Sequence, residues 1–197
     1  MTACYNAEIS AGSLMPLESR RIAAFLLTHP DDNAWKRALI DDNILQKKAP
    51  ATAIRLASLI RKRLNTLDAT ALEMVAQREQ EVVIQLLLVA AVKHSQLLAD
   101  FIKDVYIEHQ RRMDLALSPG DWDGFFSECS HRDSSIIQWS ASTQAKLFQV
   151  ILRILTEAKY LESSRSMKLT PQSLHPDVRR YLSGHGDSAL TALLERA

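Results

Sequence analysis

Residues 50–65 read PATAIRLASLIRKRLN, and the spacing of apolar side chains in this stretch predicts how the chain folds. The apolar residues recur three and four positions apart, which is the spacing of one face of an α-helix. Pro50 suits the first turn of a helix, where a backbone N–H is not needed. The stretch therefore predicts an amphipathic helix that ends near Asn65. Its buried face is expected to hold Ala53, Leu56, Ala57, Ile60 and Leu64.

The composition extends this helical expectation to most of the chain. The 197 residues include only five Gly and six Pro, and 47% of them are hydrophobic. Straight-chain residues lose little side-chain freedom in a helix, and a chain of this length can bury a substantial core. We therefore expect an all-α protein, a compact multi-helix globule with two helix-turn-helix-like units. The sequence also leaves open a small β-hairpin wing near residues 160–169.

Helix start signals divide the sequence. Ser118 can cap a helix, with Pro119 in its first turn and Asp121 as the reciprocal capping partner. Asp31 and Asp68 offer similar caps. We expect an N-terminal helical region at 1–66 with the first helix-turn-helix, connecting core helices at 67–117 and a C-terminal helical region at 118–183 with the second. The remaining residues, 184–197, are expected to form a mobile tail.

The longest apolar stretch is VVIQLLLVAAV at residues 82–92. It is far shorter than the roughly 20 residues that span a bilayer, so we expect a buried core helix and no membrane association. The first ten residues lack the pattern of a signal peptide. The two cysteines, Cys4 and Cys129, do not resemble a secreted disulfide framework. These features together predict a cytoplasmic protein.

Charge is strongly segregated along the sequence. Eight basic residues against two acidic ones lie between Lys36 and Arg63, whereas the formal net charge of the whole protein is +1. Residues 65–133 carry twelve acidic and six basic side chains, and residues 146–180 carry three acidic and seven basic ones. Basic segments on either side of an acidic middle indicate a surface for a polyanion, with nucleic acid as the first candidate. The alternative is that these charges only solvate helix surfaces.

The first basic segment has the outline of a helix-turn-helix. A short helix near residues 34–42 and a connector precede the helix at 50–65, whose outward face is basic and polar. Connector and first-turn side chains could hold the DNA backbone. Any amphipathic helical hairpin looks similar, so this pattern is weak evidence by itself. The candidate DNA-binding residues here are Lys47, Lys48, Thr52, Arg55, Ser58 and Lys62.

The second basic segment repeats the arrangement in residues 142–159. Leu147, Ile151, Ile154 and Ala158 form its expected inner stripe, and the outer row contains no acid. Residues 160–162 and 167–169 could then pair as a hairpin, which would make a winged helix with Arg165 at the wing tip. An ordinary solvated helix followed by a loop explains the pattern equally well. The candidate DNA-binding residues are Ser142, Lys146, Gln149, Arg153, Arg165 and Lys168, with Thr156 also in the outer row.

Catalytic and metal templates are missing from the sequence. No nucleotide-binding glycine loop, zinc-protease helix or hydrolase nucleophile motif occurs. Cys129 and His131 lie two positions apart, but a metal site needs three or four ligands and no CxxC partner exists. We therefore expect no enzyme activity, no metal and no cofactor.

Several short strings make the chain resemble the BrxA family of bacteriophage exclusion (BREX) defence systems. Their order and spacing carry the resemblance, which covers roughly residues 5–182. The strings are Gly12-Ser13-Leu14 with Glu18-Ser19, Trp35-Lys36-Arg37-Ala38 before Asn43-Ile44-Leu45-Gln46-Lys47, Ala51-Thr52-Ala53, Lys93-His94-Ser95 with Phe101, and Leu161-Glu162-Ser163.

The resemblance implies a small helical, non-enzymatic component of such a system. Its partners would be double-stranded DNA and other BREX components, namely a methyltransferase, an ATPase and a phosphatase-like protein, in host DNA methylation and phage restriction. Outside a complex it would be a monomer. Two alternatives remain open: a protein-protein scaffold that uses the acidic middle, and an RNA-binding protein, through a looser similarity of the family to the antitermination factor NusB.

Overall fold

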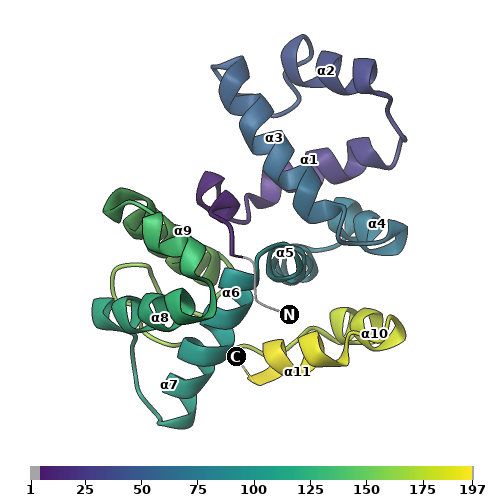
Figure 1. Ribbon diagram of the computed structural model, residues 1–197. Helices are drawn as coiled ribbons and strands as arrows, with labels where there is room; N and C mark the ends of the chain where they lie inside the picture. The colour runs from purple at the N-terminus through teal and green to yellow at the C-terminus, as the bar shows by residue number, and fades with distance from the viewer. Residues whose placement is uncertain (1–4, 197) are drawn as a thin grey trace. The chain divides into compact units, whose positions relative to one another are not determined.

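The computed structural model describes residues 5–196, and nearly all of its regular structure is helical (Figure 1). Cys4 lies outside the described residues. Among the described residues, extended pairing is limited to two isolated antiparallel β-bridges, so the all-α expectation is confirmed. The chain forms two compact units, which we call the first unit (residues 14–94) and the second unit (residues 5–13 with 95–196).

The first unit is built around a buried helix. Its helices are α1 Pro16–Leu26, α2 Asp32–Ile40, α3 Pro50–Leu64, α4 Ala69–Gln77 and α5 Gln80–His94. Every residue of α5 from Val82 to Val92 is buried, and α1, α3 and α4 all contact this helix. The apolar stretch is therefore a core helix, as predicted. No single helix in the described part of the chain is long and apolar enough to cross a membrane.

The second unit begins with a 3-10 turn, η1 Glu8–Ala11, and resumes after Ser95. A π-helical segment, η2 Ile102–Tyr106, joins α6 Gln96–Phe101 to α7 Ile107–Arg111. The other elements are α8 Pro119–Arg132, the 3-10 helix η3 Ser134–Gln138, α9 Ala141–Glu157, α10 Pro176–Gly184 and α11 Ser188–Arg196.

The predicted helix caps are present. Asp31 Oδ1 accepts a hydrogen bond from the Ala34 N–H at 2.7 Å, and Asp68 Oδ1 accepts one from the Ala71 N–H at 2.9 Å. Both bonds satisfy donors that the first turn of a helix leaves unpaired. At the start of α8, Asp121 Oδ2 accepts from the backbone N–H of Ser118 at 2.6 Å.

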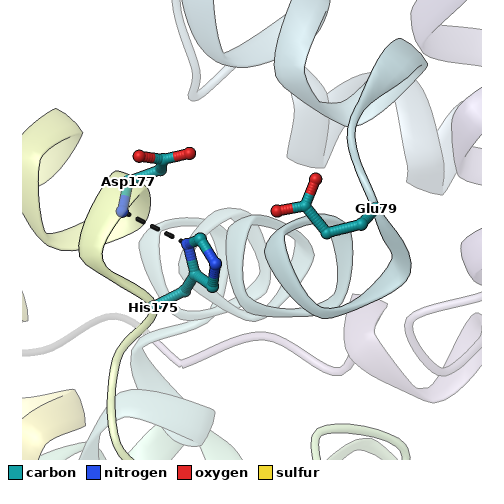
Figure 2. Close-up of side chains that lie close together, drawn as sticks. All are labelled: Glu79, His175 and Asp177. Carbon is teal, nitrogen blue, oxygen red and sulfur yellow. Dashed lines mark hydrogen bonds between the residues drawn. The ribbon is translucent and has the colours of Figure 1, made fainter.

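A cap that the sequence did not suggest begins α10. His175 Nδ1 accepts a hydrogen bond from the Asp177 N–H at 3.2 Å, and Pro176 occupies the first turn between them (Figure 2). The acidic Asp177 also suits the positive end of the helix dipole. The imidazole thus takes the place that Ser, Thr, Asp or Asn usually holds.

The C-terminal residues of the second unit differ from the expected tail. Residues 188–196 form α11, which packs against α10. The hydroxyl of Tyr160 donates to the Leu194 carbonyl at 3.1 Å, and Arg179 Nε lies 2.6 Å from Glu195 Oε1. Contacts distant in sequence therefore hold a segment, SALTALLER, whose Ala, Leu, Glu and Arg are also strong helix formers.

An aromatic cluster forms the core of the second unit around Phe101, which is fully buried. The rings of Phe101 and Phe125 meet edge to face with centroids 5.2 Å apart, and the Trp122 and Phe148 rings stack at 5.3 Å. Trp122 belongs to α8 and Phe148 to α9. The cluster therefore packs α6, α8 and α9 together and sets the position of α9.

The N-terminal segment of the second unit is anchored by Tyr5. Its hydroxyl donates to Asp100 Oδ2 at 2.6 Å, and its backbone N–H donates to Asp133 Oδ2 at 2.9 Å. Burial and the bond to Asp100 raise the pKa of Tyr5 well above its usual range. Burial raises the pKa of the neighbouring Cys129 to about 11, so this thiol stays protonated at neutral pH. A protonated, buried thiol is a poor nucleophile and a poor metal ligand.

Candidate nucleic-acid interface

Helix α9 presents the most complete of the predicted faces. Ser140 caps it by accepting a hydrogen bond from the Thr143 N–H at 3.2 Å. All four residues of the predicted inner stripe, Leu147, Ile151, Ile154 and Ala158, are buried. The outer row is solvent-facing: Ser142, Lys146, Gln149 and Arg153 are exposed, and Thr156 is partly exposed.

The face of α9 carries no negative charge. Glu157, the last residue of the helix, is its only acidic residue. Its Oε1 accepts a hydrogen bond from the Ser13 hydroxyl at 2.6 Å, which ties it to the N-terminal segment of the second unit. A polyanion approaching the exposed row therefore meets two cations and several hydrogen-bonding groups, with no acid among them.

The segment after α9 forms the predicted hairpin. Leu161 and Leu169 make an antiparallel bridge, and the Glu162 N–H donates to the Lys168 carbonyl at 3.0 Å. A turn at residues 164–166 joins the two arms, and Arg165 is exposed within it. The hairpin at residues 160–169, with Arg165 at its tip, is therefore confirmed. Lys168 is exposed, with Nζ 3.8 Å from Glu162 Oε2.

A third extended segment, which the sequence did not suggest, joins the hairpin. Ala116 bridges Lys168, the Leu117 N–H donates to the Met167 carbonyl, and the Leu169 N–H donates to the Leu115 carbonyl, both at 3.0 Å. Residues 115–117 precede α8, so the second unit runs through helix, extended segment, helix, helix and hairpin. The only sequence pattern that indicates this segment is Leu115-Ala116-Leu117, two leucines separated by one alanine.

The hairpin turn is fixed to α9 by side chains. Thr156 Oγ1 lies 3.3 Å from Ser164 Oγ and also donates to the Leu152 carbonyl at 2.8 Å. Since a hydroxyl has one proton, Ser164 is the donor toward Thr156. Arg165 therefore follows directly on a residue attached to the outer row of α9.

In the first unit, α3 also presents a basic face. Arg55, Ser58 and Lys62 are exposed, Thr52 is partly exposed, and the opposite face buries Ala53 and Ala57. Leu56, predicted to be buried, is only partly so. Leu59 is buried although it lay outside the predicted stripe. The buried face is therefore wider than the sequence indicated.

Not every side chain of the basic segment at residues 36–63 reaches the surface. Arg63 is 4% exposed and lies in the core of the first unit. The Arg61 guanidinium lies over the Trp35 ring, 4.6 Å from its centroid, in a cation–π contact. The sequence does not distinguish the eight cations of this segment, but two of the three consecutive ones at residues 61–63, Arg61 and Arg63, pack against the protein.

The connector between α2 and α3 is longer than the turn of a simple helix-turn-helix. It spans residues 41–49, whereas such turns have about three or four residues. Asn43 holds it by accepting from the Lys47 N–H at 2.9 Å and donating to the Lys47 carbonyl at 3.0 Å. Lys48 in this connector is exposed.

Lys47 already has a partner within the first unit. Its Nζ lies 2.6 Å from Glu18 Oε1. Burial by itself would raise the pKa of Glu18, but the hydrogen bond from Lys47 holds that pKa below its ordinary value. The charge of Lys47 is therefore already engaged inside the protein.

Comparison with known proteins identifies the family. The BrxA family model matches residues 3–186. The chain belongs to the BrxA family. It is 37% identical over 179 residues to the BREX protein BrxA of Paramagnetospirillum magneticum (strain ATCC 700264 / AMB-1), covering 90% of this chain and 89% of that protein. It is 34% identical to the BREX protein BrxA of Escherichia coli O9:H4 (strain HS), covering 95% of this chain and 88% of that protein.

A solved structure shows the same fold as this BrxA-family chain. It is the crystal structure of an uncharacterized protein from Magnetospirillum magneticum, with a TM-score of 0.90 and 33% sequence identity. The match covers 98% of this chain and 99% of that one. The family resemblance drawn from short strings at 5–182 is thus confirmed along nearly the whole sequence.

Proposed function

We propose that this chain is a non-enzymatic, double-stranded DNA-binding component of a BREX phage-defence system. The observation that carries the proposal is the acid-free exposed row of α9, with a hairpin fixed beside it. In the second unit, α6–α7, residues 115–117, α8, η3, α9 and the hairpin follow one another, and this order supports the interpretation of a winged helix. In helix-turn-helix proteins the second helix of the motif enters the major groove.

The chemistry of this surface fits duplex DNA. Lys146 and Arg153 can neutralise phosphates, and Arg165 can do the same from the wing. Ser142 and Gln149 can hydrogen-bond to phosphates or base edges. The α3 face of the first unit, with Arg55 and Lys62, supplies further cations, so both units contribute to binding.

A direct test is the affinity of the purified full-length protein for unrelated duplexes at several salt concentrations. Binding should weaken linearly on a plot of log affinity against log salt, because the bound cations release counterions from DNA. Competition with single-stranded RNA separates DNA binding from RNA binding. Absence of duplex binding at 50 mM salt would refute the proposal and favour a scaffold role for the acidic region at 65–133.

The same preparation should hydrolyse neither ATP nor DNA. The pair considered from the sequence, Cys129 and His131, cannot act readily because burial keeps the Cys129 thiol protonated. Within the BREX system, DNA binding would place this protein beside the components that methylate host DNA and restrict phage. It would act with a methyltransferase, an ATPase and a phosphatase-like protein in the cytoplasm, and as a monomer when alone.

A further inference from the structure

The exposed row of α9 changes in chemistry along its length. Ala141, Ser142 and Ala145 are exposed and short, so the helix backbone can approach another surface closely along its first turns. Arg153 is a long cation nearer the C-terminal end. The first half of α9 is therefore suited to contact at short range, and the second half to reaching a more distant phosphate.

Two glutamines in this helix have different surroundings. Gln144 Nε2 donates to the Trp139 carbonyl at 3.0 Å, which uses its amide to close the N-terminal turn. Gln149 is exposed, and its side chain makes no hydrogen bond with any residue that the structure describes. Its donor and acceptor are both available to a ligand.

The amide donor and acceptor of Gln149 match the major-groove edge of one base better than those of the others. In the major groove adenine presents the N7 acceptor and the N6 amino donor side by side, and a glutamine amide can pair with both. Guanine presents two acceptors there and is matched by Arg or Lys. A free Gln149 amide therefore favours adenine.

The position of Gln149 agrees with this role. Gln149 is the ninth of the 17 residues of α9 and lies in the exposed row between Lys146 and Arg153, whose cations would hold the flanking phosphates. At a rise of about 1.5 Å per residue, Ser142 to Gln149 extends over about 10 Å, which is close to three base-pair steps. At the far end of the row, Ser164 attaches the wing to Thr156, so contacts from Arg165 to the backbone would hold the helix in one register.

We propose that Gln149 determines sequence specificity by reading an adenine in the major groove. This role rests on the proposed binding of duplex DNA through α9. Lys146, Arg153 and Arg165 supply affinity, and Gln149 supplies the preference for one base.

The test is selection of duplexes from a random library by the full-length protein, followed by affinity measurements on the selected duplex and on a variant with A·T changed to G·C. The wild type should enrich adenine at one position, and the changed pair should weaken its binding by about tenfold or more. Gln149→Ala should bind both duplexes equally, with the wild-type salt slope. Arg153→Ala is the matched control from the same row: it should weaken both duplexes alike and keep the preference.

The outcomes separate the two proposals. If the wild type binds duplexes without any base preference, or if Gln149→Ala retains the adenine preference, the reading role of Gln149 is refuted while DNA binding stands. If the wild type binds no duplex at 50 mM salt, DNA binding itself is refuted. Circular dichroism of both variants checks that α9 remains folded.

Discussion

The rings of Trp122 and Phe148 stack with their centroids 5.3 Å apart and their planes inclined by 21°. Trp122 lies in α8 and Phe148 in α9, so this contact joins the two helices of the proposed DNA-binding motif. The outer row of α9 can present its cations in one orientation because the inner side of the helix is held by rigid rings. We therefore expect the stability of the aromatic cluster to support the proposed DNA binding.

Truncation of the cluster tests how much its packing contributes to stability. Phe101→Ala should lower the free energy of unfolding by about 3–5 kcal/mol, because a fully buried ring leaves a cavity that neighbouring rings cannot fill. Denaturant unfolding measures the loss. Phe126, at the edge of the cluster, is only partly buried, so Phe126→Ala should lower the free energy of unfolding by less. Equal stability of wild type and Phe101→Ala would contradict the packing argument.

The salt dependence of DNA binding should report the two basic faces separately. The double substitution Lys146→Ala with Arg153→Ala removes two phosphate contacts, so the slope of log affinity against log salt should flatten by up to about two units. Arg55→Ala with Lys62→Ala should do the same for α3. Substitution of Lys93 and Lys103, which lie in the acidic stretch, is the control and should have a much smaller effect.

Circular dichroism must show that both double variants are folded before their DNA affinities and salt slopes are compared. If both double variants kept the wild-type affinity and the wild-type salt slope, the hypothesis that the α3 and α9 faces both bind DNA would be refuted. Acid replacements in the same rows should abolish binding, because they place negative charge against the phosphates.

The contact between Thr156 and Ser164 should matter for binding more than for folding. Ser164→Ala removes the hydroxyl that donates to Thr156 and should release the wing turn, weakening duplex affinity about threefold through Arg165. Arg165→Ala measured alone and combined with Ser164→Ala gives a double-mutant cycle. Additive effects of the two substitutions would show that the contact does not position Arg165.

The capping carboxylate of α8 should give stability a recognisable pH dependence. Burial alone would raise the pKa of Asp121, but hydrogen bonds from Ser118 and the nearby His109 hold it below its ordinary value. A lowered pKa in the folded state stabilises the protein above the pKa of the unfolded chain, about 3.9, and this contribution is lost as pH falls through the folded value.

Asp121→Asn removes that titration while keeping an oxygen for the cap. The wild type should be more stable than the variant at pH 6, and the difference should shrink as pH falls below about 4. Urea unfolding at a series of pH values measures it. Glu18, whose pKa is also lowered, titrates equally in both proteins and cancels in the comparison. A difference that does not change with pH would contradict this account.

The sequence by itself determined most of the elements and one of the two faces, but it did not predict α11 or the extended segment at residues 115–117. Helix bounds, the caps at Asp31, Asp68 and Asp121, and the inner stripe of α9 follow from contacts between residues a few positions apart, and local spacing records such contacts directly. The hairpin at 160–169 belongs to this class too, since its two arms are close in the chain. The family resemblance rested on the same kind of local evidence.

Tertiary structure decided which of those side chains remain available. Burial of Arg63, pairing of Lys47 with Glu18 and attachment of residues 115–117 to the hairpin all join residues far apart in sequence. Packing creates such differences because each depends on the three-dimensional neighbour, and neither residue type nor helical spacing specifies that neighbour.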